Sequence, residues 1–457
     1  MKNYTIPAAY DTLNDDQKLA FDMLKYGIDS AQNYFLTGNA GVGKSYLIDV
    51  YTAFCKANGL NILKAAPTGT AATNIKGVTL HKLFYLPPTI VSKQVSDRQL
   101  SNIHFLIAYA DVIFIDEISM FRIDMFENVM NQIKMANKIR ANKNKQPIQI
   151  ILSGDFGQLP PVITKNDREL YKAAYGSDIK SGRCYESAEW AALGFQPIVL
   201  REQMRQGDTA FRNALDNIRI GVKSDMAYIN QNSAQSEIQD GIWLCGYKDT
   251  AAEKNALGLY KLPGEIRKSQ AIVTGKAKIS QTNMAEELIY KIGARVMMIM
   301  NKGSQYSNGS LGTIIDETIN GDIMIRLDRG YTIMVEKTPI IFYEYKAQNG
   351  RVEAVEVGKI IQYPFKIGYA VTIHKSQGQT YDSMNLVPEV FAVGQLYTAM
   401  SRCKSLSNIY IQPDHNGDKL TDNKFMADKD VVMFLIDQDG KAQQYKNWFL
   451  SNVRGIA

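Results

Sequence analysis

The octapeptide GNAGVGKS, from Gly38 to Ser45, fits the pattern G-x-x-x-x-G-K-[ST]. A short apolar stretch precedes it and apolar residues at helical spacing follow it, so a strand should enter the loop and a helix should leave it. The glycines let backbone N–H groups converge on phosphate oxygens, and the helix N-terminus adds a favourable dipole. We expect Lys44 to reach the β- and γ-phosphates of ATP and the Ser45 hydroxyl to ligate Mg²⁺. The predicted nucleotide-binding residues of this loop are Gly38, Asn39, Ala40, Gly41, Val42, Gly43, Lys44 and Ser45.

Two acidic residues end a second apolar stretch, VIFIDE, and supply groups that the loop lacks. We expect Asp116 to hold the Mg²⁺ through water and Glu117 to orient or deprotonate the attacking water. In SGDFGQLPPV, Gln158 carries both a donor and an acceptor, so it could sense whether a γ-phosphate is present. Phosphoryl transfer is catalysed mostly by positioning and charge neutralisation, so further positive charge must come from arginines elsewhere in the chain.

Three further polar segments have no role in a simple phosphotransferase. APTGTAATNI and GVTLHKLF offer N–H groups and hydroxyls that suit phosphate contacts, together with rings that could stack on bases. Their candidate nucleic-acid residues are Pro67, Thr68, Gly69, Thr79, His81 and Phe84. The alternative for this region is a solvated loop with a packed Phe84. The third segment, VTIHKSQGQT, gathers a histidine, a lysine, hydroxyls and glutamines around Gly378.

The elements that must position these residues alternate between apolar strands and helical patterns over the first two hundred residues. NYFLTG, NILKAAPTG, DVIFIDE, PIQIILSGD and PIVLRE are nearly all apolar before a polar end, which predicts a parallel sheet buried on both faces. Functional residues should then gather at the carboxyl ends of the strands. From Lys291 to Pro364 short β-rich segments alternate with Asn-Gly and Asp-Arg-Gly turns, which indicates a small antiparallel barrel or sandwich.

Composition sets the limits of this interpretation. A chain of 457 residues is too long for one core, so two to four domains are expected. Four dispersed cysteines without a CxxC pair, and only four histidines, argue against a zinc site or a disulfide framework. The sequence has no apolar run long enough to span a membrane and no signal-peptide pattern, so we expect a cytoplasmic protein with no membrane partner. The net charge of +6 is compatible with a polyanionic partner but does not establish one.

Nine motifs in a fixed order resemble those of superfamily 1 helicases, in particular the Pif-type subclass B, to which RecD-like and phage Dda helicases are related. They are LNDDQKLAF, GNAGVGKS, APTGTAA, GVTLHKLF, IDEISM, GDFGQLPPV, MRQGD, YAVTIHKSQGQT and LYTAMSRCKS. The resemblance implies an α/β fold with two RecA-like P-loop lobes, ATP between the lobes and single-stranded DNA across their top. It places the first lobe at residues 1–200 with a short wedge insertion at about 85–102, the second at 201–290 and 365–457, and an inserted SH3-like β-barrel at 291–364.

The resemblance also assigns roles around the nucleotide that spacing alone leaves open. Gln17 resembles the glutamine that reads adenine in the family, and Gly378 would lie near the nucleotide. Arg205 and Arg402 resemble the two arginines that reach the γ-phosphate from the other lobe. Together with Lys44, Asp116, Glu117 and Gln158, these arginines complete the predicted catalytic set.

For DNA, the resemblance assigns contacts in the second lobe to Thr372, His374 and Lys375. One departure puts a neighbouring segment in doubt, because Tyr247 and Lys248 stand where the family often has a Thr-Asn pair. No role is therefore carried over to that segment.

The activity implied is ATP-driven movement along single-stranded DNA, in the 5′→3′ direction, by a monomer that unwinds duplexes and uses ATP and Mg²⁺. Forked DNA and, by family resemblance, G-quadruplex DNA are implied partners. Three alternatives stay open: a P-loop kinase acting on a small molecule, a nucleotide-gated DNA-binding switch without efficient catalysis, and an RNA-directed helicase. The kinase leaves the later motifs unexplained, and the intact Glu117 and Gln158 argue against the switch. Backbone contacts without 2′-OH readout do not separate RNA from DNA.

Overall fold

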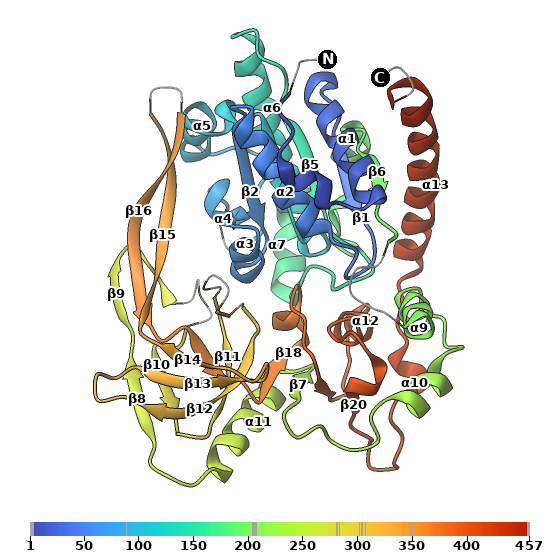
Figure 1. Ribbon diagram of the computed structural model, residues 1–457. Helices are drawn as coiled ribbons and strands as arrows, with labels where there is room; N and C mark the ends of the chain where they lie inside the picture. Colours follow the sequence, from blue (N-terminus) through green and yellow to red (C-terminus); the bar gives the residue numbers. More distant parts are fainter. Residues whose placement is uncertain are drawn as a thin grey trace. The chain divides into compact units, whose positions relative to one another are not determined.

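The computed structural model describes residues 4–87, 89–202, 208–279, 282, 284–300, 302, 305–306, 308–348 and 351–454. The chain divides into two compact units. The first comprises Met1–Arg205, Tyr345–Ala354 and Ala427–Ala457, and the second comprises Gln206–Glu344 and Val355–Met426. Each unit contains a parallel sheet, as Figure 1 shows. None of the helices in the described ranges combines the length and the hydropathy that a membrane span requires.

The first unit is organised around a six-stranded sheet of order β3-β2-β4-β5-β1-β6 in which every neighbouring pair is parallel. The strands are β1 (Tyr34–Thr37), β2 (Ile62–Ala66), β3 (Val78–Thr79), β4 (Val112–Ile115), β5 (Gln149–Ser153) and β6 (Gln196–Val199). Side chains alternate between two core clusters, with Phe35, Ile113 and Leu152 in one and Leu36, Phe114 and Ile151 in the other. The sheet is therefore buried on both faces, which explains its continuous apolar strands.

Several helices of the first unit contribute side chains to the core clusters on the two faces of this sheet. The helices of this unit are α1 (Asp15–Ser30), α2 (Lys44–Ala57), α3 (Gly69–Asn74), α4 (Leu80–Leu83), α5 (Asp97–Phe105), α6 (Ile123–Ala141), α7 (Lys165–Tyr175), α8 (Ala188–Ala192) and α13 (Lys429–Asn452). Several begin at residues that cap orphan N–H groups: Asn14, Ser96 and Thr164 each complete a reciprocal capping box.

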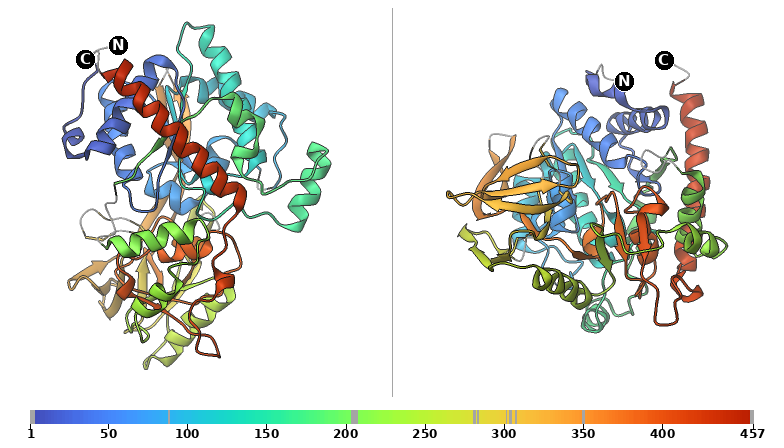
Figure 2. Two further views of the ribbon diagram at one scale, coloured as in Figure 1. Left: turned by 90° about the vertical axis from the view of Figure 1, so that its right-hand side faces the viewer. Right: turned by 60° about the horizontal axis from the view of Figure 1, so that its bottom comes forward.

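The C-terminal helix α13 corrects one expected domain boundary, since residues 365–457 were all assigned to the second lobe. The helix instead packs in the first unit, as Figures 1 and 2 show in red. Its Val431 and Leu435 join one core cluster and its Phe449 joins the other, while the Tyr445 and Tyr34 hydroxyls lie 2.9 Å apart. These long-range apolar contacts outweigh proximity along the chain.

The second unit has its own parallel sheet of order β18-β7-β19-β20. The strands are β7 (Ile242–Cys245), β18 (Ala370–Thr372), β19 (Met384–Leu386) and β20 (Ile409–Ile411), and the helices of this unit are α9 (Thr209–Arg219), α10 (Met226–Asn232), α11 (Lys248–Lys261) and α12 (Gln395–Met400). The predicted fold class, α/β with a parallel sheet at the core of each of two lobes, is confirmed.

Antiparallel strands make up much of the chain between the two parts of the second parallel sheet, and most of them belong to the second unit. A five-stranded sheet of order β14-β13-β12-β11-β17 is formed by β11 (Arg295–Met298), β12 (Leu311–Glu317), β13 (Ile323–Leu327), β14 (Thr332–Val335) and β17 (Phe365–Ile367). These strands enclose an apolar cluster that includes Val296, Ile325 and Phe365. Smaller sheets pair β8 (Arg267–Gln270) with β10 (Glu287–Tyr290), and β16 (Arg351–Gln362) with β15 (Thr338–Gln348) and β9 (Ile272–Gly275). Antiparallel pairing thus begins before residue 291.

Candidate nucleotide site and nucleic-acid contacts

The phosphate-binding loop lies between β1 and α2, where the pattern placed it. Gly38, Gly41 and Gly43 have φ angles of 141°, 90° and 82°, values that side chains with a Cβ rarely adopt. A Cβ on Gly38 would also lie 2.3 Å from the Leu200 carbonyl oxygen. Lys44 begins α2, and its Nζ donates to the carbonyl oxygens of Gly38 at 2.7 Å and Asn39 at 3.1 Å. The lysine charge is therefore held at the mouth of the loop.

Gln17 connects helix α1 to this loop. Its Oε1 accepts from the Asn14 N–H at 3.2 Å, and the Asn14 side chain accepts from the Gln17 N–H at 2.8 Å. Its Nε2 donates to the Gly43 carbonyl oxygen at 3.3 Å, and the side chain is 1% exposed. The glutamine expected to read adenine is thus part of the scaffold that positions the phosphate-binding loop.

Asp116 and Glu117 follow β4 at the carboxyl edge of the sheet. Burial raises the pKa of the Asp116 carboxyl, while the Glu117 N–H, the Ser153 hydroxyl and the Lys44 charge act in the opposite direction. The influence of Lys44 places the loop and the acid in one electrostatic environment. Glu117 has φ 51° and ψ 47°, a left-handed conformation that costs energy for a residue with a Cβ and is found at functional sites.

Several buried polar atoms at the same edge find no hydrogen-bond partner in the described part of the chain, and two of them belong to residues near the phosphate-binding loop and the paired acids. These two are Oγ1 of Thr37, which ends β1, and Oε1 of Gln158, which follows β5. Buried polar atoms of this kind are costly unless a ligand or water satisfies them. In the described ranges no group of three or more His, Cys, Asp or Glu side chains could hold a metal. The Ser45 hydroxyl and the Asp116 carboxylate are oxygen donors of the kind that Mg²⁺ takes together with substrate phosphates.

The first-unit candidates for nucleic-acid contact lie in two short turns. The Thr68 hydroxyl accepts from the Ala71 N–H at 3.2 Å, so it supports the start of α3, and Pro67 and Gly69 beside it are half-buried. The Thr79 hydroxyl caps α4 by accepting from the Lys82 N–H at 3.3 Å. Both hydroxyls accept hydrogen bonds within their own turns, so contacts to a DNA phosphate would come from backbone N–H groups.

His81 and Phe84 differ in what they offer. Burial, with a smaller contribution from Arg122, lowers the pKa of His81, so its ring is neutral at pH 7. Phe84 is 0% exposed and packs in the core with Leu80 and Leu83. The predicted stacking role of Phe84 is wrong, because a ring whose faces are covered by core side chains cannot stack on a base; the packed alternative holds.

The segment around Thr372 follows β18 in the second unit. The Thr372 hydroxyl accepts from the Lys375 N–H at 3.4 Å and is nearly buried, whereas the Lys375 side chain is exposed. The His374 ring is half-buried, 6.3 Å from the Phe391 ring, and burial lowers its pKa. Gly378 is exposed with φ 78°. Of the three residues expected to contact DNA, Lys375 is the one with an exposed, positively charged side chain.

Of the two expected arginines, the structure describes Arg402. Arg205 lies outside the described residues. Arg402 follows α12, is 2% exposed, and donates to the carbonyl oxygens of Thr398 at 2.8 Å and Gln379 at 3.3 Å. Its Nη2 also donates to the Ser401 hydroxyl at 2.8 Å. A guanidinium held this firmly is not an ordinary surface arginine.

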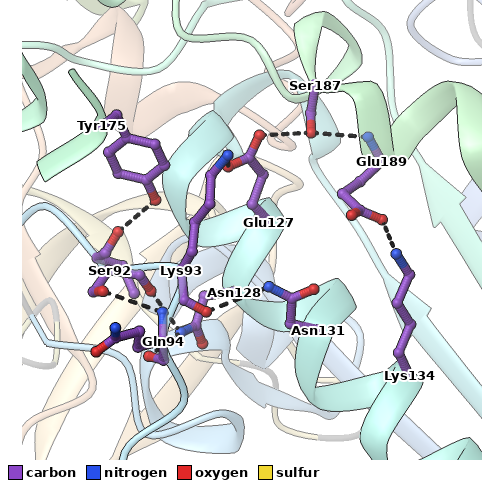
Figure 3. A network of polar contacts seen from close by, with 11 residues as sticks. Ser92, Lys93, Gln94, Glu127, Asn128, Asn131, Lys134, Tyr175, Ser187 and Glu189 are labelled. Atoms are coloured by element: carbon purple, nitrogen blue, oxygen red, sulfur yellow. Dashed lines mark hydrogen bonds and ion pairs between the residues drawn. The ribbon is translucent and has the colours of Figure 1, made fainter. Parts of the chain in front are cut away.

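Buried polar residues on α6 were not predicted as functional from the sequence. Asp124, Asn128 and Gln132 are each 0% exposed and recur every four residues along the helix. That spacing puts them on one face, so polar residues recurring every four positions along the helix were the available signal. Figure 3 shows that one of them, Asn128, donates from Nδ2 to the Ser92 carbonyl oxygen at 2.8 Å.

A Gly-rich loop from strand to helix, with paired acids at the carboxyl end of a strand in the same parallel sheet, defines a P-loop nucleoside triphosphatase. Residues 12–224 match the family model described as PIF1-like helicase. The ATP-dependent DNA helicase Pif1 of Campylobacter jejuni is 30% identical over 424 residues, which cover 86% of this chain and 91% of that protein. The chain belongs to the PIF1-like helicase family, as the nine motifs indicated.

Two solved structures are also similar. The crystal structure of Bacteroides sp. Pif1 in complex with ADP-AlF4 has a TM-score of 0.78 and 28% identity, covering 94% of this chain and 97% of that one. The crystal structure of Bacteroides Pif1 bound to single-stranded DNA has a TM-score of 0.64 and 28% identity, covering 92% and 96% of the two chains.

Proposed function

We propose that the protein moves along single-stranded DNA in the 5′→3′ direction and unwinds duplex DNA, driven by hydrolysis of Mg-ATP between two RecA-like lobes. As a PIF1-like helicase it is an ATP-dependent DNA helicase. One observation carries the proposal: the first parallel sheet ends in a phosphate-binding loop with paired acids, and the second ends in a capped turn that presents Lys375. A small-molecule kinase would have no use for that second turn.

Each residue of the nucleotide site in the first unit would have a separate role in ATP hydrolysis. The N–H groups of residues 38–45 and the Lys44 charge would hold the phosphates, and Ser45 and Asp116 would hold Mg²⁺, which neutralises phosphate charge when bound. Glu117, fixed by its left-handed backbone, would take the proton of the attacking water. The unpaired Oε1 of Gln158 could accept from that water.

The second unit would supply the remaining charge and the grip on DNA. Arg402, together with Arg205, would reach the γ-phosphate, which requires Arg402 to exchange its present carbonyl partners for phosphate oxygens. Lys375 would contact a DNA phosphate, and Thr372 would act mainly by shaping the turn. In the first unit, Gly69 and Thr79 would contribute backbone N–H contacts, whereas Pro67, which has no N–H, would offer its ring to a base.

The direct test measures ATPase with and without single-stranded DNA and then unwinding of duplexes with 5′ or 3′ tails. We expect DNA-stimulated hydrolysis and unwinding from the 5′ tail. Unwinding only from the 3′ tail would overturn the direction, and ATPase indifferent to DNA would overturn the proposal. The same assay with RNA tails tests the RNA-directed alternative, since a site without 2′-OH readout would accept both.

The preferred DNA structures and the oligomeric state belong to the same proposal. Single-stranded and forked DNA are the proposed partners, with G-quadruplex DNA added by family resemblance, and the active species is proposed to be a monomer. Competition between forked and quadruplex DNA measures the first point. Sedimentation of the protein with a short DNA strand measures the second, and a dimer on a strand long enough for one copy would contradict it.

A further inference from the structure

Three aromatic rings meet at the carboxyl edge of the second parallel sheet. Tyr247 follows β7, His374 follows β18, and Phe391 lies beyond the end of β19. These strands are parallel neighbours in the order β18-β7-β19, so the segments that leave them emerge side by side. The Tyr247 and Phe391 rings are stacked, with centroids 4.7 Å apart and planes inclined by 26°. The His374 ring is 6.3 Å from that of Phe391 and inclined to it by 22°.

Two of these rings are exposed to solvent. Tyr247 is 47% exposed and Phe391 is 50% exposed. Among the ring pairs in the described part of the chain, theirs is the one in which both members are exposed. Each ring already covers part of the other, so solvent reaches their remaining faces and edges. Apolar ring surface left in water costs free energy, which a further planar group stacked on it would recover.

Buried contacts hold the backbone that carries these rings. The N–H groups of Phe391 and Ala392 donate to Oε1 of Gln395 at 2.8 and 3.2 Å, and Gln395 is 0% exposed. The segment after β7 also packs closely against the one after β19, since a Cβ on Gly246 would lie 2.0 Å from the Glu389 carbonyl oxygen. The stacked arrangement is therefore set in advance, and a planar ligand would not have to order these segments on binding.

The charges around the rings are balanced. The charged residues within two positions of the three rings are Lys248, Asp249, Lys375 and Glu389, two of each sign. Burial, together with the Lys248 charge, lowers the pKa of His374, so this ring is neutral at pH 7. A ligand held on the rings would thus depend on their faces more than on net charge.

A positively charged site lies beside the rings. Lys375 directly follows His374 and has an exposed side chain, and Lys366 of β17 is half-buried. Burial, followed by the charge of Lys375, lowers the pKa of Lys366 to about 8, and no acidic side chain among the described residues counteracts this shift. Two lysines that repel each other favour a bound anion. Single-stranded DNA presents such an anion, a phosphate, next to every base.

We propose that Tyr247 and Phe391, together with His374, form a stacking platform for one base of the single strand, and that Lys375 and Lys366 hold an adjoining phosphate. This inference rests on the proposed helicase function and adds a contact to the bases themselves. Tyr247 stands where helicases of this family often have Thr, whose side chain cannot stack, so the platform is a feature of this chain. Because every base has a flat face, such a contact tolerates any sequence.

The test measures binding of the full-length protein to a fluorescent oligo-dT, with a non-hydrolysable ATP analogue so that the protein does not step along the strand. The shortest strand that binds with full affinity is compared with strands in which one abasic site, which keeps the phosphates, is moved from position to position. For the unaltered protein we expect one abasic position to weaken binding about tenfold, the effect of losing one stacked base.

The variants remove or keep the ring. Tyr247→Ala should weaken binding of the intact strand about tenfold and make the protein indifferent to that abasic position. Tyr247→Phe, which keeps the ring, should bind as the unaltered protein does. Phe391→Ala should repeat the effect of Tyr247→Ala, because it removes the ring on which Tyr247 stacks. In the ATPase assay, both alanine variants should need about ten times more DNA for half-maximal stimulation.

Two further variants serve as controls. Tyr260→Ala removes another exposed tyrosine, near the opposite end of α11 from Tyr247, and should change neither the affinity nor the abasic response. Lys375→Ala should weaken binding but keep the abasic penalty, and should lower the slope of log affinity against log salt concentration by about 0.7, the value for one phosphate contact on a single strand. Tyr247→Ala should leave that slope unchanged, because stacking releases no counterions.

The results separate the platform from other uses of the same rings. Folded Tyr247→Ala and Phe391→Ala variants that bind the intact strand normally would overturn the inference and assign the rings to another partner, such as a protein. An abasic penalty that persists in Tyr247→Ala would overturn it as well, even if affinity falls. If one variant does not fold, the other decides the question. Unaltered protein that does not bind single-stranded DNA would refute the proposed function and this inference with it, whereas normal helicase activity with binding independent of the rings refutes this inference only.

Discussion

Replacing Gln17 tests whether a side chain built into the scaffold also recognises the nucleotide. Gln17→Ala removes the acceptor for the Asn14 N–H and the donor to the Gly43 carbonyl oxygen. Asn14→Ala removes the side-chain cap to which the Gln17 N–H donates, and leaves the Gln17 amide in place. The two variants therefore share a damaged helix start and differ in the group that would contact adenine.

The structure sets the size of the two effects. Loss of the Asn14 cap costs about 1 kcal/mol. Loss of the Gln17 amide costs about 2 kcal/mol, since half of the capping box is lost and the Gly43 carbonyl group gives up a buried bond worth about 1 kcal/mol. If Gln17 also donates to adenine, its loss weakens ATP binding about tenfold, which corresponds to about 1.4 kcal/mol.

The assay measures the dissociation constant of a fluorescent ATP analogue and the thermal transition of both variants. We expect both to melt earlier, and only Gln17→Ala to bind the analogue more weakly. Equal weakening in Asn14→Ala would refute the reasoning, because it would show that helix stability and not adenine contact controls affinity. Unchanged affinity in Gln17→Ala would refute it as well.

Three further changes test the site and the core. Lys44→Ala should lower DNA-stimulated ATPase by at least about a hundredfold, because the positive charge that neutralises the ATP phosphates is lost. Binding of single-stranded DNA should stay largely intact, because the substitution does not alter the DNA-binding surface. Persistent hydrolysis in a colorimetric phosphate assay would point to another loop. Phe84→Ala should lower the free energy of unfolding by about 3–5 kcal/mol, as expected of a buried ring, whereas a DNA-stacking ring would lower affinity for an oligonucleotide at constant stability. Asp116→Asn should abolish ATPase yet raise the melting temperature at pH 7, because burial raises the pKa of Asp116 and makes its charged form costly in the folded state. That gain should shrink as pH falls through the raised pKa towards the ordinary value of about 3.9, where the native carboxyl is neutral too; a gain independent of pH would contradict this origin.

The phosphate-binding loop, the paired acids and the α/β class could be predicted from the sequence because each depends on contiguous residues. Glycines at 38, 41 and 43 adopt the left-handed angles that the pattern requires, and the apolar run before Asp116 is a strand buried on both faces. Local conformational preference and hydrophobic periodicity decide such features, and both can be read within about a dozen residues.

Only the tertiary structure decided which polar and aromatic side chains are engaged in the core or in internal hydrogen bonds. In the sequence Phe84 ends a motif typical of binding residues. In the structure the Gln132 side chain donates to its carbonyl oxygen and core side chains cover its ring. Gln17 meets Gly43 across 26 positions, and Asn128 meets Ser92 across 36. Helix α13 likewise joins the first unit, far from its neighbours along the chain. Burial and hydrogen-bond partners depend on residues distant in sequence, so motifs determine what chemistry is present, and packing determines which side chains are free to perform it.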